Sequence, residues 1–211
     1  MKDNSTPNTD NKNDTTKEKF NLKEEIISWI QILVIAALIA FVLNRFIIAN
    51  SRVPTASMEN TIMTKDRAIG SRLSYYFSDP QRGDVVIFYF PDDVTEKTYF
   101  VKRIIGLPGE KVRIDAHGII FINDEALDER YGTEPIHQAR DAFTPRILGE
   151  DEYFVLGDNR NDSMDSRDSS VGLVRREEII GRAFVRIYPF TSIGFIQNKK
   201  SSSEPETGEN K

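Results

Sequence analysis

The chain has 211 residues, enough for one domain with appendages, and 39% of them are hydrophobic, which is sufficient for a folded core. The formal net charge of −5 disfavours nucleic-acid binding, which a basic patch usually mediates. Cysteine is absent, and this excludes disulfides, thiolate catalysis and cysteine zinc sites.

The chain begins with a polar tail. Residues 1–23 are rich in Asn, Asp, Thr and Lys and contain almost no apolar side chain before Phe20. Such a segment cannot bury enough apolar surface to offset the entropy of ordering, so we expect it to be disordered.

An apolar run follows the tail. Ile26 to Leu43 is interrupted by only two polar residues, and at a rise of about 1.5 Å per residue it spans about 27 Å, close to the thickness of a bilayer's hydrocarbon core. Phe46-Ile47-Ile48 extends the run, so we expect a transmembrane helix over residues 24–48. A buried soluble helix and a cleaved signal peptide are the alternatives; the length favours an uncleaved anchor. Lysine and arginine flank both ends, so charge leaves the orientation open.

The pattern then changes to short extended runs, which predicts a mainly β domain over residues 49–196. Residues 124–150 are more polar and contain two prolines, so we expect an inserted cap over about residues 115–150. Residues 197–211 are expected to form a disordered tail. The expected strands are Asp84–Phe90, Tyr99–Ile105, Lys111–Ile114, Gly118–Ile122, Tyr153–Leu156 and Ala183–Tyr188, with the third and fourth forming a hairpin.

One hydroxyl lies just after the apolar run. Ser57 follows Pro54, which fixes its own φ and favours an extended conformation at Val53. A lone serine in such a place is most often a solvated turn residue. As a nucleophile it needs a base at neutral pH.

Two kinds of base are available. The two histidines, His117 and His137, lie in a hairpin turn and in the polar insert, where exposed residues are common. Lys102 lies in a predicted strand and shares a face with Phe100 and Ile104, whose apolar surroundings would lower a lysine pKa. The alternative for Lys102 is that its stem extends to bring the amine into solvent.

A dense polar segment follows the strand Tyr153–Leu156. Residues 157–167 read Gly-Asp-Asn-Arg-Asn-Asp-Ser-Met-Asp-Ser-Arg. A solvated loop or a calcium site is the ordinary interpretation, although the spacing of a calcium loop is missing. The alternative is a segment that supports a buried site through Asp–Arg pairs and hydroxyl hydrogen bonds.

Taken together and in this order, these segments resemble the bacterial type I signal peptidases, in their compact single-span Gram-positive form. The resemblance covers about residues 26–190. It is carried by Pro54-Thr55-Ala56-Ser57-Met58, Arg82-Gly83-Asp84-Val85-Val86, Val101-Lys102-Arg103-Ile104-Ile105-Gly106, and Gly157-Asp158-Asn159-Arg160 with Ser163, Asp165, Ser166 and Arg167. One departure is Asn60, which stands where the family often has proline.

The resemblance implies roles for individual residues. Ser57 is expected to be the nucleophile and Lys102 the general base. The expected oxyanion hole is the Thr55 hydroxyl with the Ser57 backbone N–H. The expected supporting residues are Ser163, which orients Lys102, the ion pair Asp165–Arg167, and Asp158, and the residues expected to line the substrate pockets are Val53 and Val101.

The implied protein is a membrane-anchored serine endopeptidase with an antiparallel β-rich catalytic domain, and it requires no metal or cofactor. It would cleave signal peptides from exported preproteins after small residues, at sites of the Ala-X-Ala type. The implied topology has a cytoplasmic N-terminus and an extracytoplasmic catalytic domain in the cell membrane. The implied partners are signal-peptide-bearing preproteins, the lipid bilayer and nearby secretion machinery, without nucleic acid.

Two other functions fit part of the pattern. One is a Ser-Lys autoprotease similar to the SOS-response repressors, in which a DNA-binding head stands where this chain has an apolar run. The other is a catalytically silent β module that binds exported chains. Retention of both Ser57 and Lys102 argues against the silent module.

Overall fold

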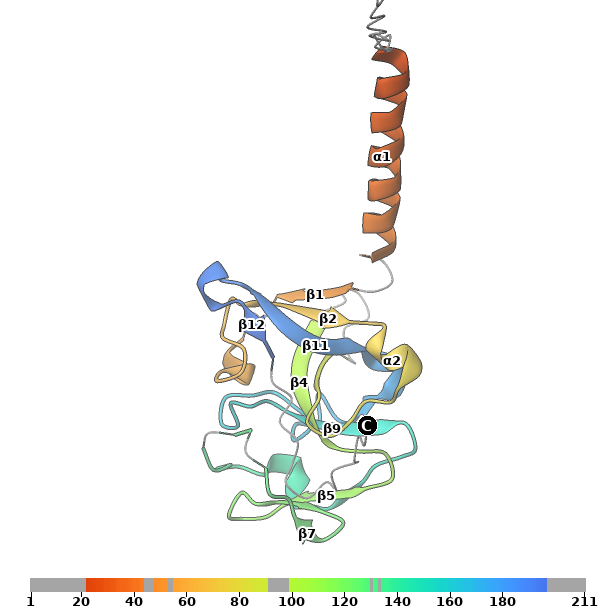
Figure 1. Cartoon of the computed structure of the whole chain (residues 1–211). Coiled ribbons are helices and arrows are strands. Elements are labelled where there is room, and N and C mark those ends of the chain that lie inside the picture. The colour runs from red at the N-terminus through yellow and green to blue at the C-terminus, as the bar shows by residue number, and fades with distance from the viewer. Residues whose placement is uncertain are drawn as a thin grey trace, which may run out of the picture. The chain divides into compact units, whose positions relative to one another are not determined.

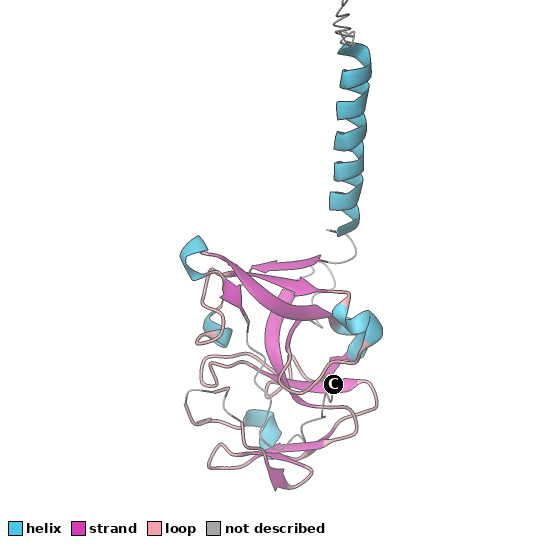
Figure 2. Ribbon diagram, viewed as in Figure 1, coloured by secondary structure: helices cyan, strands magenta, loops and turns pink. Residues whose placement is uncertain are grey.

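The computed structural model describes residues 22–43, 48–52, 55–90, 99–129, 131–132 and 134–196. The first element is helix α1, Leu22–Val42, which is long and apolar enough to cross a membrane (Figures 1 and 2). Its large apolar side chains are exposed along its whole length, so the helix requires an apolar environment around it, such as lipid.

The boundaries of this helix correct two expectations. Leu22 and Lys23 are helical, although residues 1–23 were expected to be disordered. Ile48, which was expected to end the transmembrane span, instead begins strand β1, Ile48–Arg52, which pairs along its whole length with β2. Strand pairing therefore outweighs the apolar pattern at this point. The tails over residues 1–21 and 197–211 lie outside the described residues.

The rest of the described chain is built on a large antiparallel sheet of eight strands in the order β1-β2-β11-β3-β4-β9-β10, with β12 paired to β11. Figure 1 shows the long strand β11 crossing the sheet beside β2. The strands other than β1 are β2 Arg67–Ser71, β3 Val85–Tyr89, β4 Tyr99–Gly106, β9 Glu152–Leu156, β10 Val174–Arg175, β11 Ile179–Tyr188 and β12 Gly194–Phe195. The short helical segments are η2 Ala56–Met58, α2 Ser74–Phe77, η4 Arg176–Glu178 and η5 Phe190–Ser192.

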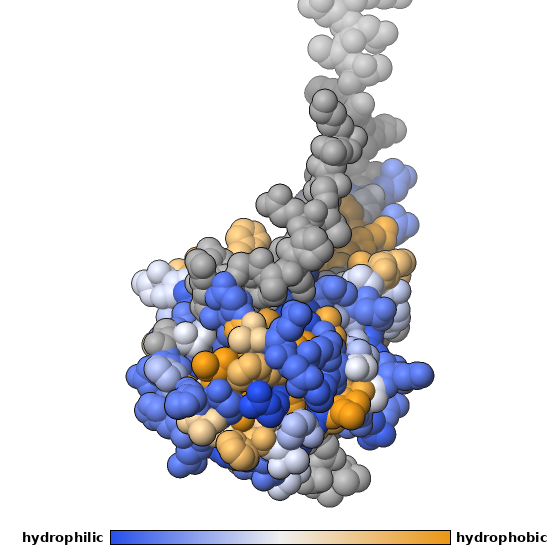
Figure 3. Space-filling view, turned by 90° about the horizontal axis from the view of Figure 1, so that it is seen from below, coloured by the Kyte–Doolittle hydropathy of each residue, from blue (hydrophilic) through white to orange (hydrophobic). Residues whose placement is uncertain are grey.

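The region expected to be a small cap contains most of a second sheet of four strands in the order β7-β6-β5-β8. Its strands are β5 Lys111–Ile114, β6 Ile120–Ile122, β7 Glu125–Ala126 and β8 Arg146–Ile147, with the short helix η3 Arg140–Phe143 beside them. The predicted hairpin is present, with Val112 opposite Ile122. Seen from the end that carries this small sheet, the surface is mainly hydrophilic with separate apolar areas (Figure 3).

The small sheet is attached to the large one by a shared apolar core. The cluster combines Ile105 of β4 and Phe154 and Leu156 of β9 with the inward side chains of β5 and β6. Gly106 ends β4 where a Cβ would lie 2.6 Å from the Val112 side chain, so glycine allows this close packing. The predicted fold class, mainly β and antiparallel, is confirmed.

Candidate active site

Ser57 lies in the short helical turn η2. The turn is closed by the Glu59 N–H, which donates to the Ala56 carbonyl at 2.9 Å, and is continued by the Ile62 N–H, which donates to the Met58 carbonyl at 2.8 Å. Met58 and Ile62 are buried in an apolar cluster with side chains of β3 and β4, among them Val85 and Val101. The two apolar side chains therefore fix the turn, and Ser57 itself is only 4% exposed.

Lys102 extends toward this turn from the middle of β4, where it pairs with Val86 of β3. Its Nζ lies 2.5 Å from the Ser57 Oγ, and the Thr55 Oγ1 lies 3.1 Å from the same oxygen. Lys102 is 1% exposed, and its Nζ lies 5.2 Å from the centre of the Phe100 ring. The sequence left open whether the Lys102 amine extends into solvent. In the structure it does not, because the amine is buried.

Burial changes the acidity of this amine. Desolvation lowers the pKa of Lys102 from 10.5 to about 8, because the ammonium form loses its hydration inside the protein. The Asp165 and Asp158 carboxylates oppose the shift by favouring the charged form, and the Arg167 guanidinium adds to it. A substantial fraction of Lys102 is therefore neutral slightly above neutral pH, which a proton acceptor for a hydroxyl requires.

The side chain next to Lys102 points to the opposite side of β4 and supports the site from there. Arg103 forms two hydrogen bonds with Asp158, Nε to Oδ1 at 2.8 Å and Nη2 to Oδ2 at 2.6 Å, and both side chains are buried. Thr61 donates to the same carboxylate at 2.5 Å. Strand alternation predicts the side on which Arg103 lies, but its partner, from a segment 55 positions away in the sequence, was not predicted.

The predicted ion pair, Asp165–Arg167, is formed within the polar segment. Arg167 donates to Asp165 through Nε and Nη2, both at 2.8 Å, and also to the Arg160 carbonyl at 2.6 Å. Asp165 in turn accepts the Gly157 N–H at 3.1 Å. These bonds hold residues 157–167 in a compact loop, and the carboxylates Asp158 and Asp165 are paired with arginines. Among the described residues no His, Cys, Asp and Glu group suited to a metal is found.

Ser163 is a buried residue of this loop, but its predicted bond to Lys102 is not formed in the structure. Among the described residues its Oγ has no hydrogen-bond partner. A Cβ on Gly157 would lie 2.2 Å from that oxygen, so only glycine allows the loop to pass so closely. The role of Ser163 toward Lys102 stays a prediction.

The remaining predicted residues lie in three different settings. His117 and His137 are exposed, and the side-chain hydrogen bonds found at the Ser57 hydroxyl involve Lys102 and Thr55. Val101 is buried in the apolar cluster that contains Met58, and Val53 lies outside the described residues. Asn60 has a φ of 85°, in the left-handed region that proline cannot adopt, so the turn after Ser57 depends on a residue other than proline.

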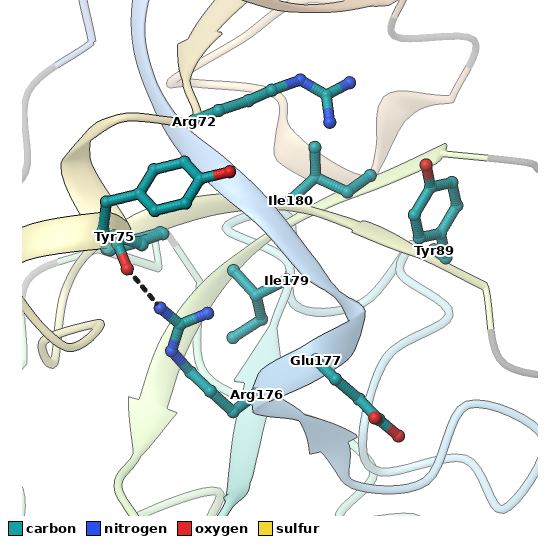
Figure 4. Close-up of a pocket in the computed structure, with 8 residues that line it drawn as sticks. Arg72, Tyr75, Tyr89, Arg176, Glu177, Ile179 and Ile180 are labelled. Carbon is teal, nitrogen blue, oxygen red and sulfur yellow. Dashed lines mark hydrogen bonds between the residues drawn. The ribbon is translucent and has the colours of Figure 1, made fainter. Parts of the chain in front are cut away.

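A separate hollow of about 280 Å³ opens between α2, β3 and the start of β11. Figure 4 shows Arg72, Tyr75, Tyr89 and Arg176 around it, and the Arg176 guanidinium donates to the Tyr75 carbonyl at 2.6 Å. Neither Ser57 nor Lys102 lines this hollow, so the paired hydroxyl and amine belong to a different place in the fold.

The fold and the site together describe a β-rich domain that buries a serine hydroxyl against a lysine amine of lowered pKa and that follows an apolar helix in the sequence. The sequence profile of the family described as signal peptidase, peptidase S26, matches residues 26–188. A probable signal peptidase I-2 of Synechocystis sp. is 37% identical over 190 residues, which cover 87% of this chain and 83% of that protein.

Two further proteins that are similar to this chain are also described as signal peptidases I. Signal peptidase I S of Bacillus subtilis is 34% identical over 184 residues, covering 83% of this chain and 96% of that protein. A crystal structure of a signal peptidase I from Enterococcus faecalis V583 is 32% identical, with a TM-score of 0.41 over 50% of this chain and 97% of that one. The chain belongs to the signal peptidase family S26 and is a serine endopeptidase that cleaves signal peptides.

Proposed function

We propose that this peptidase works through a dyad in which Ser57 is the nucleophile and Lys102 the general base. The observation that carries the proposal is the 2.5 Å separation of the Ser57 Oγ and the Lys102 Nζ, both buried, with the lysine pKa lowered to about 8. A neutral amine at this distance accepts the hydroxyl proton directly, without an intervening water.

The reaction then has two halves. Ser57 Oγ attacks the scissile carbonyl while its proton moves to the Lys102 Nζ, and the ammonium returns a proton to the leaving amine, which leaves an acyl-enzyme. In the second half the neutral Lys102 accepts a proton from a water that attacks the ester carbonyl. It returns this proton to the Ser57 Oγ as the ester C–O bond breaks, and the signal peptide leaves as an acid that ionises to the carboxylate.

The developing negative charge needs donors close to Ser57. The Thr55 hydroxyl, 3.1 Å from the Ser57 Oγ, is one candidate. The Ser57 backbone N–H is the other, because N–H groups at the beginning of a helical turn lack an acceptor within that turn. We assign the oxyanion hole to these two groups.

The substrate pockets and the membrane topology are assigned by analogy with the family. Cleavage after small residues, at Ala-X-Ala type sites, would require shallow pockets, to which Val53 and Val101 are expected to contribute.

Helix α1 would anchor the chain in the cell membrane with a cytoplasmic N-terminus, and the catalytic domain would meet preproteins on the other side, near the secretion machinery. Protease added to intact spheroplasts should digest the catalytic domain; protection until the membrane is opened would reverse this topology.

The dyad is tested by cleavage of a purified signal-peptide-bearing precursor. The wild-type protein in detergent should release the mature chain, and sequencing of the new N-terminus should place small residues before the cut. Ser57→Ala should bind the precursor without cleaving it. Cleavage by the folded Ser57→Ala protein would refute the proposed nucleophile.

A further inference from the structure

The loop after β9 contacts the backbone of the nucleophile turn through one residue, Asn159. Its backbone N–H donates to the Ser57 carbonyl at 3.1 Å. Its side-chain amide, through Nδ2, donates to the Ala56 carbonyl at 3.2 Å. A single residue therefore binds two successive carbonyls of the turn that carries the proposed nucleophile.

Neighbours on both sides hold Asn159 in place. Gly157 allows the approach, because a Cβ there would lie 2.3 Å from the Ser57 carbonyl oxygen. Asp158 is fixed by its buried ion pair with Arg103. Arg160 is buried and donates to Glu129 at 2.6 Å through Nη2. With both flanking side chains anchored, the Asn159 amide has little freedom to follow a movement of the turn.

The bond to the Ala56 carbonyl has a consequence for catalysis, because a peptide group is planar. The Ala56 carbonyl and the Ser57 N–H belong to the same peptide group and point in opposite directions. A donor on the carbonyl therefore fixes the direction of the N–H. It also polarises the group, since hydrogen bonds in a chain strengthen one another, which makes that N–H a better donor.

We propose that Asn159 is a positioning residue for the oxyanion hole: through the Ala56 carbonyl, it orients and polarises the Ser57 N–H that receives the negative charge. The proposal rests on the proposed dyad and oxyanion hole. Asn159 is proposed to act through the backbone of the turn, so its effect is expected in the transition state rather than in the binding of the precursor.

Two substitutions separate a hydrogen bond from simple packing. Asn159→Asp keeps the shape and the backbone N–H but places a carboxylate oxygen against the Ala56 carbonyl. Asn159→Ala removes the side-chain donor without adding repulsion. Loss of an oxyanion donor lowers kcat by about 10²–10³-fold, and these variants misdirect the donor without removing it. We therefore expect kcat to fall about 10-fold for Asn159→Ala and about 10²-fold for Asn159→Asp, with KM changed less than about threefold in both.

Asn161 provides the matched control. It lies two residues further along the same loop, where its amide donates to the Pro135 carbonyl and to Glu134, both at 3.1 Å. Asn161→Ala and Asn161→Asp change the same chemical group away from the turn, and kcat should stay within about twofold of wild type.

A peptide aldehyde with the precursor's cleavage-site sequence distinguishes positioning from damage to the fold. It forms a hemiacetal: the Ser57 Oγ bonds to the aldehyde carbon, and the π electrons of the C=O bond move to the aldehyde oxygen, which becomes an oxyanion. The serine proton passes to Lys102. The inhibition constant of the aldehyde is measured on intact active sites, so partial unfolding leaves it unchanged. The proposal expects the aldehyde to bind about 10-fold more weakly to Asn159→Ala, whereas a product peptide ending in a carboxylate should bind as to wild type.

The outcomes are distinct. Wild-type kcat and aldehyde affinity in both Asn159 variants would overturn the proposal, and so would a loss of active sites with unchanged kcat per site. Neither result would affect the dyad, provided that Ser57→Ala is inactive. Activity in Ser57→Ala would instead remove the dyad on which the proposal rests.

Discussion

The large sheet and the loop after β9 bury charged side chains around Ser57, whereas the small sheet buries aliphatic and aromatic side chains in the cluster that it shares with β4 and β9. Buried charges are costly unless each one is paired, and Asp158 and Asp165 each have an arginine partner. Lys102 has a hydroxyl as its partner instead, and its pKa falls. The comparison suggests that the large sheet carries the chemistry at some cost in stability, and that the small sheet contributes stability.

The largest expected effect is that of removing the Lys102 amine. Lys102→Met keeps a similar stem and should lower kcat/KM for precursor cleavage by about 10⁴-fold or more, as expected when a catalytic base is lost. Lys111→Met is the matched control, because Lys111 lies on β5 of the small sheet and is partly exposed. It should cleave at the wild-type rate. Cleavage by folded Lys102→Met would assign the base elsewhere, and His117 and His137 would be mutated next.

The lowered pKa of Lys102 also predicts how stability depends on pH. Between pH 8 and 10.5 the unfolded chain binds a proton that the folded protein has lost, so wild-type stability should rise with pH in this window. Below pH 8 both states are protonated and the full cost, about 3 kcal/mol, is present; above pH 10.5 it is absent. The measurement is the free energy of unfolding of the wild type relative to Lys102→Met across this range. A difference that does not change with pH would mean that the lysine is not desolvated.

The activity should report the same titration. On the acid side kcat/KM should rise about tenfold per pH unit and level off near pH 8, where the lysine becomes neutral. Lys111→Met should show the same profile as the wild type. A profile that levels off near pH 6.5 would indicate histidine instead.

A cavity in the core of the small sheet should lower stability and leave the chemistry intact. Ile114 is fully buried in β5, and Ile114→Ala removes methyl groups from the cluster shared with Phe154 and Leu156. We expect a loss of about 2–5 kcal/mol in the free energy of unfolding and a wild-type kcat for the molecules that remain folded. If kcat per active site falls as well, the small sheet takes part in the reaction and the comparison fails.

Loss of the Thr55 hydroxyl should have a smaller effect than loss of the lysine. Thr55→Val keeps the shape and removes the donor that lies 3.1 Å from the Ser57 Oγ. The expected result is a kcat lower by about 10²-fold with little change in KM, measured on the same precursor. Thr64→Val is a control for the substitution itself, because the Thr64 hydroxyl bonds Glu59 instead of Ser57. Unchanged kcat in Thr55→Val would exclude Thr55 from the oxyanion hole.

The parts of the fold that the sequence predicts are those encoded by local pattern. The strands β3, β4, β5 and β9 follow β-branched and aromatic runs, and the structure places them within one or two residues of the expected ends. Strand β1 was missed because Ile48 was assigned to the apolar run of the helix and the residues after it, Ala49–Arg52, show no apolar alternation. Strand β2 was missed because its five residues, Arg67–Ser71, show little alternation. These strands form by pairing, β1 with β2 and β2 also with β11, and a local sequence pattern does not contain this information.

The site was predictable to a similar extent. Ser57 and Lys102 come together as the resemblance implies, and strand alternation correctly separates Lys102 from Arg103. Three further contacts join segments that are distant in the sequence: the ion pair of Arg103 with Asp158, the hydrogen bond from Asn159 to the Ala56 carbonyl, and the ion pair Arg160–Glu129. The sequence does not show which distant segments meet in space, so these contacts could be identified only in the folded structure.

The smallest expected effect concerns an exposed ion pair on the small sheet that is closer than the buried pair Arg167–Asp165. Lys111 Nζ lies 2.5 Å from the Asp124 carboxylate, compared with 2.8 Å for Arg167 and Asp165. The Lys111 and Asp124 side chains are 37% and 69% exposed, so water screens their attraction and hydrates each partner once the other is removed. Asp124 has a φ of 71°, which asparagine tolerates well, so Asp124→Asn removes the charge without adding backbone strain. We expect the free energy of unfolding to change by less than about 0.5 kcal/mol, whereas Asp165→Asn, which leaves Arg167 buried without its carboxylate, should cost about 3–5 kcal/mol. Urea unfolding of the two variants measures both values. Equal losses would show that burial does not decide the strength of these pairs, and the contrast between the two sheets would then have to be explained by geometry alone.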